Sequence, residues 1–153
     1  MVLMSVSLTE GQVRARTKTV TRRMGWLGLE PGTRLTLCRK VMGRRRGEPL
    51  VRIVDVVVED VRRERLALIT AEDVRAEGFP DWTPNEFVAF FCRSHRGCTP
   101  ETTVTRIQWR YLADDTATLA GVDPSIQRAG MDLLTHVRAN VAAGYNPTTQ
   151  KEQ

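Results

Sequence analysis

The sequence contains few histidines and cysteines, and this scarcity excludes several kinds of catalytic site. Only two histidines occur among the 153 residues, which leaves too few candidates for a Ser–His–Asp triad or for a metalloprotease pair of helical histidines. A glycine-rich loop of the kind that holds phosphates is also missing. The three cysteines are an odd number, which favours free thiols over a framework of disulfides. We therefore expect no triad hydrolase of that kind, and neither a metal nor another cofactor.

One short segment, CRSHRGC, does bring Cys92, His95 and Cys98 close together in the sequence. A structural zinc site needs four ligands, usually arranged as pairs at short spacing. Here two single cysteines flank one histidine, and the other candidates, Cys38 and His136, are remote in the sequence. The spacing therefore favours free thiols at the end of a helix over a metal site.

Long apolar runs are missing as well. No segment approaches the roughly 20 consecutive apolar residues that a membrane-spanning helix requires. The first ten residues, MVLMSVSLTE, lack the charged start and long apolar middle of a signal peptide. Hydrophobic residues make up 41% of the chain and charged residues 27%, which are ordinary values for a globular domain. We expect a cytoplasmic protein that makes no contact with a membrane.

Lysine is scarce, yet the chain is basic. Lys18, Lys40 and Lys151 are the only lysines, so arginine carries most of the positive charge behind the net charge of +5 and the pI of about 9.6. Arginine binds phosphates and base edges through two parallel hydrogen bonds, although GC-rich genomes also encode many arginines without such a role. The charge is compatible with nucleic acid or another polyanion as a partner.

Apolar patterns and capping residues predict the order of the secondary-structure elements. Residues 2–8 are typical of a strand, Thr9 of the cap of a short helix, and residues 18–23 of an extended segment. After a turn at Pro31 and Gly32, a second strand passes through Leu35 and Leu37. The next strand, at 50–61, is almost continuously apolar, which predicts burial on both faces. Two capped helices, at about 70–78 and 83–95, and a closing strand at 102–112 complete the order.

This order predicts an α+β fold, with a small mixed sheet of about five strands that curls into a barrel. We expect this domain to span residues 1–112. Residues 113–144 predict a helical extension that Asp123 caps and Gly144 ends, and residues 145–153 form a polar tail. The extension is suited either to packing on its own domain or to forming a homodimer, in which case the protein is a dimerising accessory protein.

Four segments follow one another in the chain: TKTVTRR, ITAEDVRAEGF, WTPNEFVAFFCR and VTRIQWRYL. This succession resembles the ASCH domain (activating signal cointegrator homology), a family in the PUA-like superfamily of small β-barrels, from about Met4 to Tyr111. The family signature is a glycine, any residue, a lysine, four residues and an arginine. Lys18 and Arg23 fit this spacing, whereas Arg16 stands in the place of the glycine. The resemblance implies a pocket for RNA, a nucleotide or a modified base.

The resemblance also implies a candidate catalytic set. Some bacterial members of the family are amidohydrolases that remove the acyl group from N4-acetylcytidine, and their lysine, threonine and glutamate correspond to Lys18, Thr21 and Glu77. Thr21 would be the nucleophile if Lys18 were neutral, a state that burial or a neighbouring positive charge favours. Residues three apart on an extended strand point to opposite faces. Lys18 and Thr21 therefore share a pocket only if the chain bends between them.

The other candidates are ligand contacts from the signature segment, the helix pair and a basic loop. They are Arg22, Arg23, Trp26, Trp82, Arg44, Arg45 and Arg46. The tryptophans are suited to stacking on a base, or alternatively to packing in the core. The three arginines of the loop are suited to phosphate contacts, or to a solvated hairpin tip. Two functions remain open: a domain that binds RNA, another nucleic acid or a modified nucleoside, and an amidohydrolase acting on an acylated cytidine or a related nucleoside.

Overall fold

Five strands form one mixed sheet in the order β1-β3-β4-β5-β2. The strands are β1 (Val2–Ser5), β2 (Val20–Arg23), β3 (Arg34–Cys38), β4 (Arg52–Arg65) and β5 (Thr103–Tyr111). β1 runs parallel to β3, and the other neighbours are antiparallel. This computed structural model describes residues 1–113, of which 1–112 form one compact unit. The predicted C-terminal helix and polar tail lie outside the described residues.

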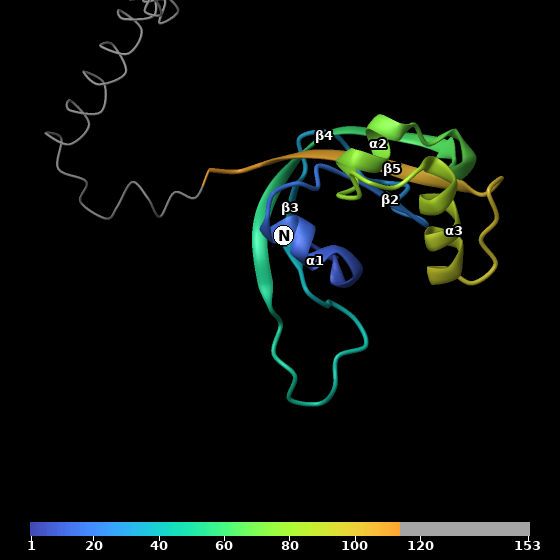
Figure 1. Cartoon of the computed structure of the whole chain (residues 1–153). Coiled ribbons are helices and arrows are strands. Elements are labelled where there is room, and N and C mark those ends of the chain that lie inside the picture. The colour runs from blue at the N-terminus through green and yellow to red at the C-terminus, as the bar shows by residue number, and fades with distance from the viewer. Residues whose placement is uncertain (114–153) are drawn as a thin grey trace, which may run out of the picture. The chain divides into compact units, whose positions relative to one another are not determined.

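The 14-residue strand β4 bends the sheet into a half-barrel (Figure 1). Its first part pairs with β3 and its second part with β5. The register of β4 shifts between Val58 and Asp60, and such irregularities increase the bend and twist of a strand. β1 and β2 become the two edges of the curled sheet. The predicted α+β fold with a small, curled five-stranded sheet is therefore confirmed.

Within residues 1–113, three short helices accompany the sheet: α1 (Glu10–Arg14), α2 (Ala71–Ala76) and α3 (Pro84–Ser94). Two one-turn 3₁₀ segments, η1 (Ser7–Thr9) and η2 (Leu66–Leu68), precede α1 and α2. The predicted start of α3 is confirmed, because Thr83 and Glu86 form a reciprocal capping box. Thr70 caps α2 by accepting a hydrogen bond from the Asp73 amide. Thr9 stands at the N-cap of α1, but its side chain makes no capping hydrogen bond.

The apolar residues form two clusters. One is built on β1, β3, β4 and β5, and its largest member is Trp109, which is 1% exposed. The other joins α2 and α3, through Val74, Phe87 and Phe91, to the segment that follows β4 and to the start of β5. Among the described residues, no helix is long and apolar enough to span a membrane.

The prediction that β4 is buried on both faces is wrong. Within the strand only Val56 and Val58 are fully buried, and the other residues are partly or fully exposed. The neighbours of β4 are both antiparallel, and an antiparallel sheet commonly packs one face on the core and leaves the other to solvent. The apolar composition of the strand therefore predicted more burial than the structure has.

Gly78 provides a test of the contact between the end of α2 and α1. Its φ is +97°, and a Cβ there would lie 2.6 Å from Cγ of Gln12. We expect Gly78→Ala to lower the free energy of unfolding by about 1–3 kcal/mol, because both the backbone and the neighbour must shift. Urea denaturation measures this change.

Gly11, inside α1, is the matched control, since a Cβ there would meet no atom within 4 Å. Gly11→Ala should raise the free energy of unfolding by about 0.5–1 kcal/mol, because alanine favours the helix. Equal effects of the two substitutions would contradict the close approach at Gly78.

Candidate functional site

The chain bends sharply between α1 and β2. Arg16, which stands where the ASCH signature has glycine, adopts a φ of +58°, a left-handed conformation. The amides of Thr17 and Lys18 then both donate to the Gln12 carbonyl, at 3.0 and 3.4 Å. β2 begins only at Val20, so Lys18 precedes the strand. The turn therefore lies before Lys18, at the position of the signature glycine, and Lys18 stands outside the regular strand that carries Thr21.

The same segment completes the C-terminal end of α2. A helix leaves its last carbonyl groups without partners inside the helix. Here the amide of Thr19 donates to the Ala76 carbonyl at 2.8 Å, and Nζ of Lys18 donates to the Glu77 carbonyl at 3.1 Å. A cation is favourable at this end of a helix. The end of α2 therefore places Lys18 and fixes Glu77 beside it.

Lys18 and Glu77 form a buried ion pair. Their side chains are only 2% and 3% exposed, and Nζ of Lys18 also donates directly to Oε2 of Glu77. Burial lowers the pKa of Lys18, and the Glu77 carboxylate opposes this change. An ammonium group has three donors, and Glu77 accepts from it twice. One N–H of Lys18 thus has no partner within residues 1–113 and remains available to a ligand.

Arg22 extends this pair into a larger group of charges. It donates to Glu77 at 3.3 Å and to Glu64 at 2.7 Å, and it also contacts Asp73. Arg106 in turn holds both oxygens of Asp73, with two hydrogen bonds of 2.9 Å. Three cations thus face three carboxylates in what we call the ion cluster: Lys18, Arg22, Arg106, Glu64, Asp73 and Glu77.

Arg23 connects the two edges of the half-barrel. It lies at the end of β2, and its Nη2 donates to the carbonyl of Ser5, the last residue of β1. Its Nε is buried without a hydrogen-bond partner in the described part of the chain. A gap in the sheet between β1 and β2 is therefore spanned by a side chain instead of a strand.

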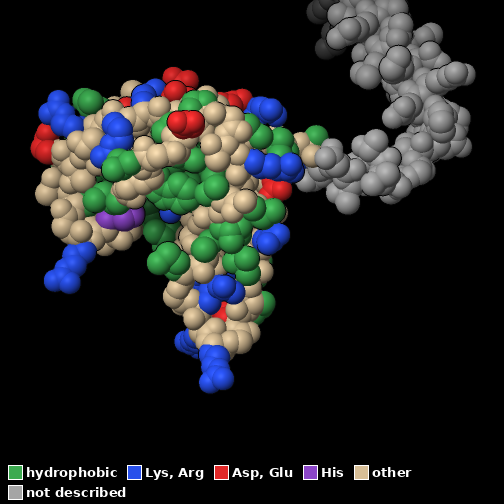
Figure 2. Space-filling model, turned by 180° about the vertical axis from the view of Figure 1, so that it is seen from behind, with side chains coloured by type: hydrophobic (Ala, Val, Ile, Leu, Met, Phe, Trp, Pro, Cys, Tyr) green, Lys and Arg blue, Asp and Glu red, His purple; other side chains and the backbone are tan. Residues whose placement is uncertain are grey.

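A half-open pocket lies over this gap, with a volume of about 90 Å³. Its charged and polar lining includes Lys18, Thr21, Arg22, Arg23 and Glu77. Its aromatic lining comes from the end of α2 and from α3: Phe79, Phe87, Phe90, Phe91 and His95. The remaining side is formed by the segment from Ser5 to Thr9 together with Ser94. Figure 2 shows a hollow in the surface with hydrophobic side chains around it.

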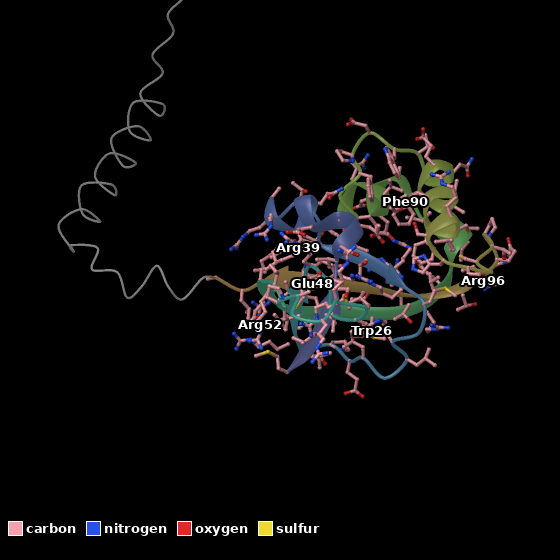
Figure 3. The ribbon with its side chains drawn as sticks, turned by 90° about the horizontal axis from the view of Figure 1, so that it is seen from below. Trp26, Arg39, Glu48, Arg52, Phe90 and Arg96 are labelled. Carbon is pink, nitrogen blue, oxygen red and sulfur yellow. The ribbon has the colours of Figure 1, made fainter. Side chains whose placement is uncertain are left out.

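The structure thus brings together five of the candidate residues and leaves the others apart. Neither Trp26 nor Trp82 lines the pocket. Trp26 packs against the sheet cluster, and in Figure 3 it lies across the strands from Phe90. Trp82 stacks on Phe79, with ring centroids 4.3 Å apart, and belongs to the helix cluster. Both tryptophans therefore fit the alternative of packing in the protein better than the alternative of stacking on a ligand.

The basic loop between β3 and β4 also lies outside the pocket lining. Arg44 is tied to the loop itself, because it donates to the carbonyls of Val41 and Glu48 at 3.2 Å each. Arg45 and Arg46 have exposed side chains. Figure 2 shows lysine and arginine side chains at the end of the hairpin that projects from the molecule.

Sequence reasoning missed the aromatic wall and three members of the ion cluster. The aromatic wall is formed mainly by the three phenylalanines of α3, none of which was a candidate ligand contact. Nothing in the local sequence distinguishes Asp73 from other helix residues, or Glu64 and Arg106 from other strand residues. A useful signal was the position of Arg106 in a strand expected to be largely buried, since a buried arginine needs a buried carboxylate.

Asp73 makes the stability of the ion cluster dependent on pH. Burial acts to raise its pKa, but the hydrogen bonds from Arg106 and Arg22 prevail and lower it from 3.8 to about 2. The carboxylate therefore stabilises the fold above pH of about 4, and this contribution is lost as the pH falls towards 2.

We expect Asp73→Asn to cost about 3 kcal/mol at pH 7, because two buried arginines lose a charged partner. The difference from the unmodified protein should shrink between pH of about 4 and 2 when urea denaturation is followed against pH. Asp81→Asn, on an exposed residue between α2 and α3, should have little effect at any pH. A deficit in Asp73→Asn that stays constant down to pH 2 would contradict the ion cluster as described.

The chain matches no protein-family model and no curated protein. Solved structures do resemble it. The protein EF3133 from Enterococcus faecalis V583, described with the family model DUF984, has a TM-score of 0.52 at 12% identity, over 72% of this chain and 78% of that one. The hypothetical protein PH0355 has a TM-score of 0.50 at 14% identity, over 72% of this chain and 96% of that one.

An ASCH domain from Lactobacillus crispatus JV V101 is also similar, with a TM-score of 0.48 at 12% identity, over 68% of this chain and 70% of that one. Identities this low establish the fold alone. The chain shares the fold of the EF3133 and PH0355 proteins, and the ASCH-like fold expected from the sequence is confirmed at that level.

Proposed function

We propose that the pocket binds a nucleobase, presented either by RNA or by a free nucleoside. The observation that carries this proposal is a fixed polar floor, formed by Lys18, Arg22 and Glu77, beside an aromatic wall. A base offers the matching features, because its edge carries hydrogen-bond donors and acceptors while its faces stack on aromatic rings. The ASCH resemblance, which implies such a ligand, supports the same conclusion.

The floor has donors and acceptors in fixed positions. Lys18 has one N–H left for a ligand, which suits a base carbonyl. Glu77 is held by both Lys18 and Arg22, so its carboxylate is fixed before a ligand arrives. Fixed polar groups lose little freedom on binding, which favours affinity and selectivity for one base. The pocket is half-open, so the sugar and any attached RNA strand would remain outside it.

Phe90 offers a test of base stacking. It is only half-buried on α3 and faces the pocket. We expect Phe90→Ala to weaken the binding of N4-acetylcytidine or cytidine by about 10- to 100-fold in a calorimetric titration, since stacking of one base on an aromatic ring contributes about 1–3 kcal/mol. Asn85→Ala, on the exposed face of α3, is the matched control and should leave affinity unchanged. Equal affinity of the two variants would contradict stacking on this wall.

A second candidate function, amide hydrolysis, is favoured by one specific observation. Glu77 is far from Lys18 and Thr21 in the sequence, yet all three residues line the same pocket. The hydroxyl of Thr21 has no hydrogen-bond partner among residues 1–113, which leaves it available to a substrate. In this function Lys18 keeps its proton and polarises the acyl oxygen, because two of its N–H groups already donate to Glu77. Glu77 would accept the proton of the attacking hydroxyl or water.

Thr21→Val removes the hydroxyl and nearly preserves the volume. If the protein hydrolyses N4-acetylcytidine, cytidine should appear in a chromatographic assay, and this variant should reduce the rate at least 100-fold. Thr103→Val, on an exposed residue of β5, should retain the full rate. Binding of N4-acetylcytidine without any release of cytidine would leave nucleobase binding as the function and exclude hydrolysis of this substrate.

A further inference from the structure

Two thiols outside the proposed ligand contacts lie against each other. Cys92 belongs to α3 and Cys98 to the loop that follows, and their Sγ atoms are 3.4 Å apart. Both are free and partly buried, whereas the third cysteine, Cys38, is fully buried in β3. The expectation of free thiols is met, but the sequence did not reveal that two of them are in contact.

The loop between the two cysteines holds them in this position. The amide of His95 donates to the Cys92 carbonyl at 3.4 Å, and the amide of Cys98 donates to the His95 carbonyl at 3.1 Å. Gly97 supplies a φ of +76°, which turns the chain back towards the helix. The chain is therefore already closed around the two sulfur atoms. A disulfide requires them to approach by only about another 1.4 Å, which a side-chain rotation can supply.

His95 does not join the cysteines as a third ligand. Its Nδ1 is paired with the Phe91 carbonyl at 2.9 Å, and its ring stacks on Phe91 with centroids 4.1 Å apart. Within residues 1–113, no three His, Cys, Asp or Glu side chains are grouped to hold a metal. The chemistry left to the pair is that of a dithiol.

We propose that Cys92 and Cys98 form a redox-active dithiol, which a hydroperoxide converts into an intramolecular disulfide. The thiolate of Cys98 attacks one peroxide oxygen, the O–O bond breaks, and the products are a sulfenic acid and hydroxide, which becomes water on taking a proton. The sulfur of Cys92 then displaces the sulfenic oxygen as a second water and loses its own proton. Two thiols and one hydrogen peroxide give one disulfide and two waters, so two electrons pass from sulfur to oxygen.

The order of the two steps follows from the surroundings of each sulfur. Burial and the neighbouring Cys98 raise the pKa of the Cys92 thiol to about 11, so Cys92 stays protonated at neutral pH. Cys98 lies in the loop beyond the helix, with its Sγ 3.7 Å from the Thr99 carbonyl. We therefore assign the first attack to Cys98 and the resolving step to Cys92.

The segment that the disulfide would close also forms part of the pocket. Phe91, Ser94 and His95 line the pocket, and Cys92 is adjacent to Phe91 in the chain. The disulfide would fasten the end of α3 to the following loop and so hold this side of the pocket in one position. The modification itself does not depend on what the pocket binds, so it can fail or succeed independently of the proposed function.

The experiment treats the full-length protein with hydrogen peroxide, blocks the remaining thiols with N-ethylmaleimide under denaturing conditions, and digests with trypsin. We expect one blocked thiol, Cys38, in place of three. Peptides 76–93 and 97–106 should be joined with the loss of two hydrogens, because trypsin cleaves after Arg93 and Arg96, between the cysteines. Dithiothreitol added after the peroxide and before the blocking step should restore all three thiols. Separate peptides, disulfides between two chains, or irreversible oxidation of Cys98 alone would overturn the proposal.

Two serine variants test the order of attack. In Cys92→Ser the sulfenic acid on Cys98 has no resolving thiol, so dimedone, which reacts with sulfenic acids, should label Cys98. In Cys98→Ser the remaining Cys92 should stay largely unlabelled. A Cys92→Ser protein that is folded, as judged by its thermal unfolding, and yet remains unlabelled would overturn the assignment of Cys98 as the attacking thiol.

Discussion

The buried ion cluster is the constraint on which the site depends. Its members come from β2 and the residues just before it, from β4, from β5, and from α2 and its C-terminal cap, so charge pairing connects elements that are distant in sequence. A buried charge without a partner is very costly, and each of these groups therefore requires the others. Such a cluster contributes less to stability than apolar packing of the same volume. Its physical effect is to hold a set of polar groups ready beneath the pocket.

The local features of this fold could be predicted from the sequence. The helix starts at Thr70 and Thr83 depend on residues within one turn, and the strands β2 and β5 are indicated by β-branched residues and alternation. The segment around Lys18 was singled out by its resemblance to a known signature, which carries information that local patterns do not, and several of its residues line the pocket. The signature did not predict which side chains from other elements would surround this segment.

The features that escaped prediction depend on contacts between distant segments. The burial of β4 depends on what covers each face of the sheet, and that follows from topology, not from the composition of the strand. Trp26 and Phe90 show the same limit: each is an aromatic residue near the candidate segments, and only the curl of the sheet decides which one faces the pocket. The contact between Cys92 and Cys98 likewise requires the turn at Gly97.

Arg16 stands where the ASCH signature has a glycine, and it adopts the left-handed conformation that a glycine usually provides. The left-handed φ at this position costs an ordinary residue about 1–2 kcal/mol, a cost that glycine avoids. Arg16 offsets part of it, because its guanidinium lies 5.4 Å from the centre of the Tyr111 ring, and the Tyr111 hydroxyl donates to the Lys18 carbonyl at 2.5 Å. In this chain the turn is present although the glycine is absent. Chains that have lost this glycine can therefore retain the pocket and still escape a search based on the signature.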